Sequence, residues 1–111
     1  MTTTEYSAAV PPEVELNNQR LGQFLGKETI LVCKISASPQ AVSVWKKGVR
    51  RIEKQSNGNV NANYRPEIYE ENDYRVTLYL RIRVITSIDF GNYTCEASNG
   101  LGSSSATMEL Y

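Results

Sequence analysis

The 111-residue sequence predicts an all-β domain in which antiparallel strands form a sandwich or a barrel. Two observations predict this class. Short runs of alternating apolar and polar residues are separated by frequent turn signals, and no convincing helical run lies between them. The length and the 41% hydrophobic content are those of one globular domain with a single core.

The clearest strand is YRVTLYLRIRVI, residues 74–85. Successive side chains of a strand point to opposite faces, so the alternation predicts a strand with one buried face and Leu80 in the core. The buried face carries Val76, Leu78, Leu80 and Ile82, and the opposite face carries Arg75, Thr77, Tyr79, Arg81 and Arg83. We interpret the second face as a solvated sheet surface, with a basic recognition face as the alternative.

Shorter strands are predicted before and after this run. Residues 12–16 and 21–25 read as one broken first strand, and 28–36, 42–47 and 104–111 read as further strands. The Asn99-Gly100 pair predicts a hairpin turn before the last strand. In the polar stretch 53–66, Asn57-Gly58 predicts a small hairpin between strands 49–55 and 60–64 with a mobile tip. The alternative is a mobile loop throughout.

Two cysteines and the single tryptophan favour the sandwich. Cys33 and Cys95 fall on the inward faces of two different predicted strands, and Trp45 lies on a strand between them. A disulfide that joins two sheets across a core, with one large aromatic ring packed against it, requires this order. The alternative is a pair of buried free thiols, as found in reducing compartments.

Tyr93 precedes Cys95 by two residues and shares its face, so its ring is expected in the core. A buried tyrosine hydroxyl needs a hydrogen-bond partner, and the turn that contains Asp89 and Gly91 can supply one. Asp89 can in addition accept hydrogen bonds from the backbone amides of its own turn.

These residues carry a family resemblance. LRIRVITSIDFGNYTCEASNGLG resembles the immunoglobulin I-set pattern L-x-I-x-x-V-x-x-x-D-x-G-x-Y-x-C-x-A-x-N-x-x-G, with Ile85 in place of valine. The matching positions are Leu80, Ile82, Asp89, Gly91, Tyr93, Cys95, Ala97, Asn99 and Gly102, and upstream Gly26, Leu31, Cys33, Pro39, Trp45 and Gly48.

The resemblance implies an immunoglobulin-like β-sandwich over residues 11–111, in which one Cys33–Cys95 disulfide pins two antiparallel sheets. Residues 1–10 are then a linker or an added tail. The cysteine separation is long for the set, and the excess falls in 53–66. Within the superfamily, the chain looks most like later domains of IgLON, lachesin and Dpr-interacting neuronal surface proteins.

Composition argues against several function classes. The sequence has no histidine, so it lacks the usual serine or cysteine triads and histidine-based metal sites, and we expect neither enzyme activity nor a cofactor. The acidic run EIYEENDY lacks the calcium-loop pattern, so we expect no metal. Twelve basic and twelve acidic residues balance, which argues against nucleic-acid binding, and no apolar run is long enough to insert into a membrane.

The remaining candidate sites lie on the surface. Asn92-Tyr93-Thr94 is a glycosylation tripeptide, and Asn92 is expected to point outward because Tyr93 points inward. A glycan there would cover part of its sheet or the neighbouring turn, which argues against that patch as a tight binding surface.

Two pairs of apolar residues are also expected to face outward: Val42 with Val44, beside Lys46, and Ile30 with Val32. Each pair either marks a contact patch or is partly covered by long neighbouring side chains.

Two oppositely charged segments complete the surface. KKGVRR (46–51) is basic and EIYEEND (67–73) is acidic. They either neutralise each other across the fold or orient a partner.

The resemblance implies an extracellular adhesion or recognition module, cut from a longer secreted or membrane-anchored protein. The expected partners are other cell-surface proteins, including homophilic or immunoglobulin-superfamily partners, and neighbouring domains of the same chain. One alternative is an intracellular structural domain of the giant muscle-protein type, with reduced cysteines and no glycan. Another is a soluble immune-recognition module.

Overall fold

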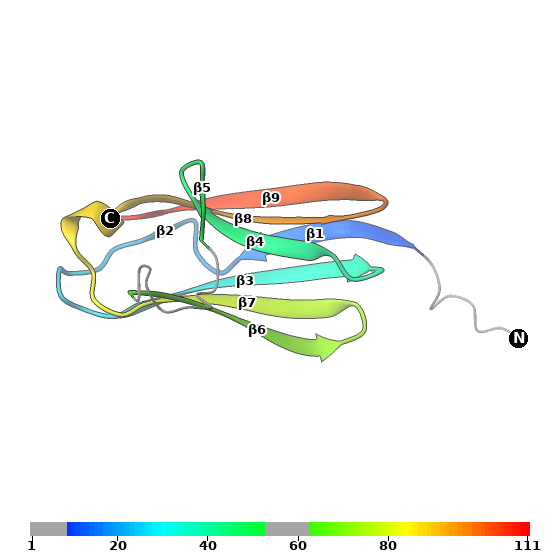
Figure 1. Ribbon diagram of the computed structural model, residues 1–111, viewed down its shortest axis with the longest axis horizontal. Coiled ribbons are helices and arrows are strands. Elements are labelled where there is room, and N and C mark those ends of the chain that lie inside the picture. The colour runs from blue at the N-terminus through cyan, green and yellow to red at the C-terminus, as the bar shows by residue number, and fades with distance from the viewer. Residues whose placement is uncertain (1–8, 53–62) are drawn as a thin grey trace, which may run out of the picture.

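The computed structural model describes residues 9–52 and 63–111, which form two β-sheets packed face to face (Figure 1). Within each sheet the neighbouring strands are antiparallel, except for the parallel pair β2 and β9. The four-stranded sheet has the order β1 (Val10–Leu16), β3 (Thr29–Ser38), β7 (Arg75–Ile82) and β6 (Tyr64–Asn72). The five-stranded sheet has the order β2 (Arg20–Leu21), β9 (Gly102–Leu110), β8 (Gly91–Asn99), β4 (Val42–Lys47) and β5 (Arg50–Ile52).

The first strand is broken, as predicted, and its two parts belong to different sheets. β1 pairs with β3, whereas β2 pairs with the end of β9. The prediction that the second part runs over 21–25 is wrong, because the strand ends at Leu21 and Phe24 and Leu25 are exposed in the following loop. Their apolar character therefore does not report a buried strand.

The alternation predicted for the core strands is confirmed. Leu31, Cys33 and Ile35 of β3 are buried, and Leu80 of β7 is fully buried opposite Leu31. One residue of the outer face departs from the expectation of a solvated surface, since Thr77 is only 2% exposed. Thr77 lies between the long side chains of its cross-strand partners Lys34 and Tyr69, which limit its access to water.

β6 shares only Tyr64 with the predicted strand 60–64 and continues to Asn72, so the prediction missed nearly all of it. It is the edge strand of its sheet, and most of its side chains are exposed on both faces. An edge strand without a continuous buried face gives no alternating pattern, so periodicity could not find it. The predicted turn at Asn57-Gly58 and residues 1–8 of the predicted tail lie outside the described residues.

Helical structure in the described residues is confined to one 3-10 turn, Ser87–Asp89. No helix in this part of the chain has the length and apolar character needed to cross a membrane.

The Cys33–Cys95 disulfide joins β3 of one sheet to β8 of the other, and both cysteines are fully buried. Trp45 of β4 is the cross-strand partner of Cys95 and is 1% exposed, so its ring packs in the core beside the bridge. The described residues contain no free cysteine. The sandwich and its single disulfide are therefore as expected from the sequence.

The turn before β8 is held by Tyr93. Its buried hydroxyl donates a 2.6 Å hydrogen bond to the backbone carbonyl of Asp89. The buried Asp89 carboxylate accepts hydrogen bonds from the backbone N–H of Thr86 at 2.8 Å and from the Thr86 hydroxyl at 3.0 Å. Both roles expected for Tyr93 and Asp89 are present.

Tyr64, at the start of β6, extends this arrangement and was not anticipated. Its hydroxyl donates to Asp89 Oδ1 at 2.6 Å and lies 3.2 Å from the Tyr93 hydroxyl. Burial, followed by the hydrogen bond to Asp89, raises the pKa of Tyr64 from 10.0 to about 12. Burial likewise raises the pKa of Tyr93. The two phenols and one carboxylate thus link the edge of one sheet to the interior of the other.

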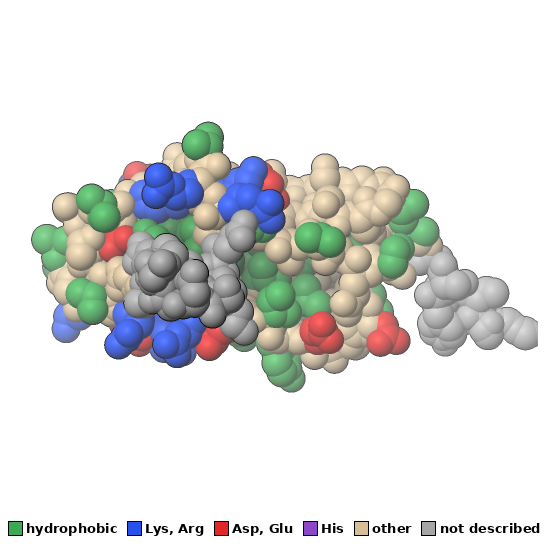
Figure 2. Space-filling model, in the orientation of Figure 1, with side chains coloured by type: hydrophobic (Ala, Val, Ile, Leu, Met, Phe, Trp, Pro, Cys, Tyr) green, Lys and Arg blue, Asp and Glu red, His purple; other side chains and the backbone are tan. Residues whose placement is uncertain are grey.

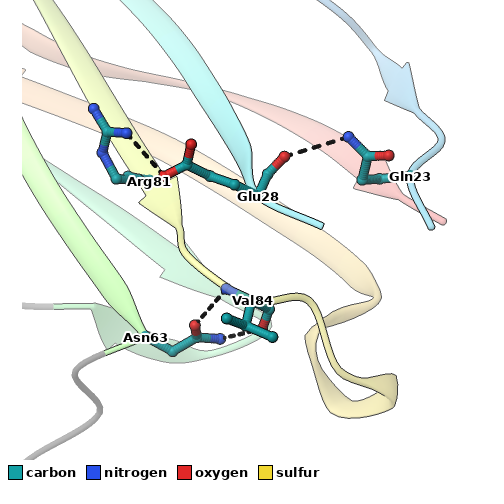
Figure 3. A network of polar contacts seen from close by, with 5 residues as sticks. All are labelled: Gln23, Glu28, Asn63, Arg81 and Val84. Atoms are coloured by element: carbon teal, nitrogen blue, oxygen red, sulfur yellow. Dashed lines mark hydrogen bonds and ion pairs between the residues drawn. The ribbon is translucent and has the colours of Figure 1, made fainter. Parts of the chain in front are cut away.

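Asn63 makes a second link at the same place (Figure 3). Its side chain accepts a 2.7 Å hydrogen bond from the backbone N–H of Val84 and donates a 2.8 Å bond to the Val84 carbonyl. Nearby, Arg81 pairs with Glu28 at 2.8 Å, and Gln23 donates to the Glu28 carbonyl. These contacts hold the segments before β3, before β6 and after β7 against one another.

Removing the disulfide with the Cys33→Ala/Cys95→Ala double variant should lower the free energy of unfolding by about 4 kcal/mol. Without the cross-link, the unfolded chain has a higher conformational entropy. Urea unfolding followed by the fluorescence of Trp45, the only tryptophan, gives the measurement. A loss below about 1 kcal/mol would show that the bridge does not hold the sheets together.

Replacing Tyr64 by phenylalanine should cost about 1–3 kcal/mol, because Asp89 then loses its shortest hydrogen-bond donor inside the protein. Tyr69→Phe is the matched control, since Tyr69 is 59% exposed on the same strand. Equal stabilities of the two variants in urea unfolding would contradict this role for Tyr64.

A comparison of the wild type with Tyr64→Phe also tests the pKa of Tyr64 through the pH dependence of stability. The folded pKa of Tyr64 lies above its usual value, so its contribution to stability is complete below pH 10 and is lost as the pH rises towards 12. The difference in unfolding free energy between the wild type and Tyr64→Phe should therefore shrink over that range. A constant difference would argue against the raised pKa.

Candidate functional site

The outer face of the five-stranded sheet brings together the predicted surface residues Val42, Val44 and Lys46. All three lie on β4 and alternate with the inward-facing Trp45. Val42 is 75% exposed, whereas Val44 and Lys46 are partly buried. A shallow groove of about 560 Å³ runs over this face, and its further lining residues are Arg51, Glu96, Ala97, Ser98, Ser103, Ser104 and Ser105.

Strand register arranges the groove in rows that cross β4, β8 and β9. Val42 lies opposite Ser98, which lies opposite Ser103. In the next row Val44 lies opposite Glu96, which lies opposite Ser105. In these rows the valines come from β4, whereas β8 contributes Ser98 and Glu96 and β9 contributes serines.

The next row towards Asn92 is polar and consists of Lys46, Thr94 and Thr107. Lys46 forms a 3.2 Å ion pair with Glu96. The hydroxyls of Thr94 and Thr107 lie 2.8 Å apart across β8 and β9. Exposed pairs of this kind contribute little to stability, so the charges of Lys46 and Glu96 remain accessible to a partner at small cost. A surface that combines exposed valines with charged and hydroxyl side chains has the mixed composition of a protein-binding surface.

Asn92 is exposed on the outer face of β8, as predicted from the direction of Tyr93. Its cross-strand partner is Glu109, and it lies four residues from Glu96, about 13 Å along the strand. The position is compatible with a glycan. The groove-lining Lys46 lies opposite Thr94, two residues from Asn92, whereas Val42 lies opposite Ser98 near the other end of β8. A sugar on Asn92 would therefore border the Lys46 end of the groove.

On the opposite face of the molecule, Ile30 and Val32 of β3 also point outward, as expected. Ile30 is 40% exposed and Val32 is partly buried beside its cross-strand neighbour Tyr79. Here the Arg81–Glu28 ion pair flanks the apolar residues. Val32 therefore fits the alternative of partial cover by a long neighbouring side chain, whereas Ile30 remains exposed.

Comparison with known proteins identifies the family to which this fold belongs. A family model described as an immunoglobulin domain matches residues 11–99. Human Contactin-4 is 40% identical over 86 residues, which cover 78% of this chain and 7% of Contactin-4. Synaptogenesis protein syg-1 of Caenorhabditis elegans is 30% identical over 93 residues, which cover 83% of this chain and 12% of syg-1. The chain therefore spans a small part of the length of these relatives.

Solved structures give the same fold. A chain in the complex of Dpr2 Ig1-Ig2 with DIP-Theta Ig1-Ig3 is 30% identical with a TM-score of 0.83, covering 93% of this chain and 32% of that one. Titin domains A168-A170 are 28% identical with a TM-score of 0.71, covering 92% of this chain and 32% of that one. The resemblance to neuronal cell-surface proteins holds, and the chain belongs to the immunoglobulin domain family.

Proposed function

We propose that the chain is an extracellular recognition and adhesion module that binds another protein through the groove on β4, β8 and β9. The observation that carries the proposal is the exposure of Val42 beside Val44 within a shallow, polar-rimmed groove. Exposed apolar side chains gathered in one place mark contact surfaces. The groove offers no histidine and both cysteines are joined, so its role is binding and not catalysis.

Three observations support the extracellular setting. A disulfide between two sheets forms and persists in oxidising compartments. The related syg-1 is named for synaptogenesis, and the Dpr2 and DIP-Theta chains form a complex of two immunoglobulin-domain proteins. By analogy the partner is another cell-surface protein, an immunoglobulin-superfamily member or a copy of the same protein, with neighbouring domains in the same chain.

The similarity to titin A168-A170 favours a second candidate, an intracellular structural domain that acts as a mechanical link. That role requires neither an oxidised Cys33–Cys95 pair nor a glycan on Asn92. Identity and fold agreement are higher for the Dpr2 and DIP-Theta complex, so we place adhesion first.

Introducing two carboxylates into the groove with Val42→Glu/Val44→Glu should weaken partner binding at least about tenfold, because the apolar contact would have to bury charge. Binding of the tetramerised domain to cells that display immunoglobulin-superfamily ectodomains gives the measurement. The control is Ile30→Glu/Val32→Glu, which makes the same change on the other sheet. Equal loss in both variants would contradict the assignment of the groove.

Intact mass after expression in a eukaryotic secretory host should show the loss of two hydrogens and an N-linked sugar. The sugar should disappear in Asn92→Gln, whereas the loss of two hydrogens should remain. Two free thiols and an unmodified Asn92 would instead support the muscle-type domain.

A further inference from the structure

β9 forms an edge of the five-stranded sheet over most of its length (red in Figure 1). On one side β8 pairs with β9 along the whole strand, from Gly102 to Leu110. On the other side β2 pairs only with Glu109 and Leu110. Residues 103–108 of β9 therefore have a neighbouring strand on one side only.

The contacts with β2 fix the direction of the backbone groups in β9. The N–H of Glu109 donates to the Gln19 carbonyl at 2.9 Å, and the N–H of Tyr111 donates to the Leu21 carbonyl at 3.0 Å. The amides of these two alternate residues thus point away from β8. Amides of an antiparallel strand point alternately to its two sides, so the direction of the remaining ones follows.

Three residues of β9 turn their N–H and carbonyl groups to the open edge. The register with β8 continues without a shift to Gly102, so the alternation assigns this direction to Ser103, Ser105 and Thr107. In the described part of the chain, the edge-facing groups of these residues have no hydrogen-bond partner. All three residues are exposed. A row of unpaired backbone groups is a template for a further strand.

β1 passes over β9 without covering this edge. It contacts both β8 and β9, which places it above the space between the two strands. A side chain at Gly102 would point to the inner face, as that of the buried Met108 does, and would lie 3.7 Å from Pro11. β1 therefore lies against the inner face of β9 and leaves the edge groups open.

The other edge strands carry features that prevent strand addition. β1 contains Pro11 and Pro12 and β6 contains Pro66, and proline lacks the N–H that a ladder needs. β5 is only three residues long, and two of them are arginines. Figure 2 shows the charges on the β5 and β6 side, with Lys and Arg towards the C-terminal half and acidic side chains over the far end of β6. Residues 103–107 of β9 contain neither a proline nor a charge.

We propose that two copies of the chain associate through this edge, with their β9 strands antiparallel and a two-fold axis at Ser105. Two identical antiparallel strands are related by such an axis, so each copy supplies the same donors and acceptors to an isologous contact. Ser105 then faces Ser105 of the second copy, and Ser103 of each copy faces Thr107 of the other. The open groups of both strands are paired by about six hydrogen bonds.

A second copy fits this edge in length and in the size of its side chains. The side chains that meet across the axis are small hydroxyls, which are favourable cross-strand neighbours. The same kind of pair exists inside the sheet, where the hydroxyls of Thr94 and Thr107 lie 2.8 Å apart. In this register β9 of the second copy turns away at its own Gly102, before it reaches β2.

The pairing has a consequence for binding. The axis is perpendicular to the sheet, so the two five-stranded sheets form one continuous face and both grooves point to the same side. A dimer that engages two partner molecules on one surface gains avidity without a new contact in the groove. The inference goes beyond the proposed groove and does not depend on it, because Val42 and Val44 lie on β4, which β8 separates from β9.

Ser105→Pro tests the pairing at the axis. The N–H of Ser105 makes no bond to β8, so its loss leaves the ladder between β8 and β9 intact and removes a donor only from the edge. The variant should dimerise at least about tenfold more weakly than the wild type. Sedimentation velocity over a range of protein concentrations measures the dimerisation constant, and thermal unfolding confirms that the variant is folded.

Ser105→Lys gives a second variant that does not change the backbone. It places two like charges beside the axis and should weaken dimerisation by at least about tenfold as well. Ser87→Lys is the matched control, because Ser87 is exposed in the 3-10 turn before β8 and away from the open edge. The control should dimerise as the wild type does. Equal dimerisation of the two lysine variants would contradict the proposed axis.

Charge exchange tests the register of the two strands. Ser103→Glu/Thr107→Glu and Ser103→Lys/Thr107→Lys each bring like charges together, since residue 103 of one copy faces residue 107 of the other. Each variant alone should dimerise at least about tenfold more weakly than the wild type, whereas their equimolar mixture should associate with near wild-type affinity. A mixture that stays monomeric while the wild type dimerises would contradict the antiparallel register.

The salt dependence separates this contact from one driven by ion pairs. β1 of each copy brings the exposed Glu13 and Glu15 towards the second copy, and salt screens this repulsion. Added salt should therefore leave the dimer unchanged or strengthen it. A dimer that weakens as salt is added would argue against the uncharged edge.

Amide hydrogen exchange identifies the surface directly. The N–H groups of Ser103, Ser105 and Thr107 should exchange at least about tenfold more slowly in a concentrated sample than in a dilute one, because dimerisation pairs them. Val42→Glu/Val44→Glu should show the same protection and the same dimerisation constant as the wild type, so failure of the groove and failure of the edge are distinguishable.

Two results would overturn the inference outright: a wild-type chain that remains monomeric at all concentrations, and a dimer in which these three amides stay unprotected. A monomer whose three amides become protected only when a groove partner is added would assign the edge to a strand of that partner instead.

Discussion

The bridge between Cys33 and Cys95 is the constraint on which the rest of the structure depends. It fixes β3 over β8, and the strand orders then decide which edges and faces of the two sheets coincide. Trp45 fills the space beside it on the neighbouring strand. Once these three residues are in place, alternation along β4 directs Val42 and Val44 outward. The surface chemistry of the domain is thus a consequence of its core.

A buried polar cluster complements the covalent link. Tyr93 ties β8 to its preceding turn, while Tyr64 brings the start of β6 to the same carboxylate. Asp89 has no cationic partner in this cluster and is satisfied by hydroxyl, amide and backbone donors. Such a network is favourable only when every member is bonded, so the loss of one phenol exposes the cost of the buried carboxylate. This ties the otherwise peripheral β6 to the core, and with it the acidic segment.

The groove on β4, β8 and β9 combines two exposed or partly exposed valines with charged and hydroxyl side chains. A mixed surface of this kind resembles protein-binding faces, in which apolar contacts are surrounded by polar groups.

The sequence alone determined the strands with a buried face, the inward direction of Cys33, Cys95 and Tyr93, and the outward direction of Asn92. These follow from period-two alternation, a local property of the chain. Tertiary structure decided what alternation does not encode: the partnership of Tyr64 with Asp89, the burial of Thr77 under its neighbours, and the full extent of the exposed strand β6. It also decided that the basic and acidic segments lie apart, because distances between residues remote in sequence are set by how the sheets pack.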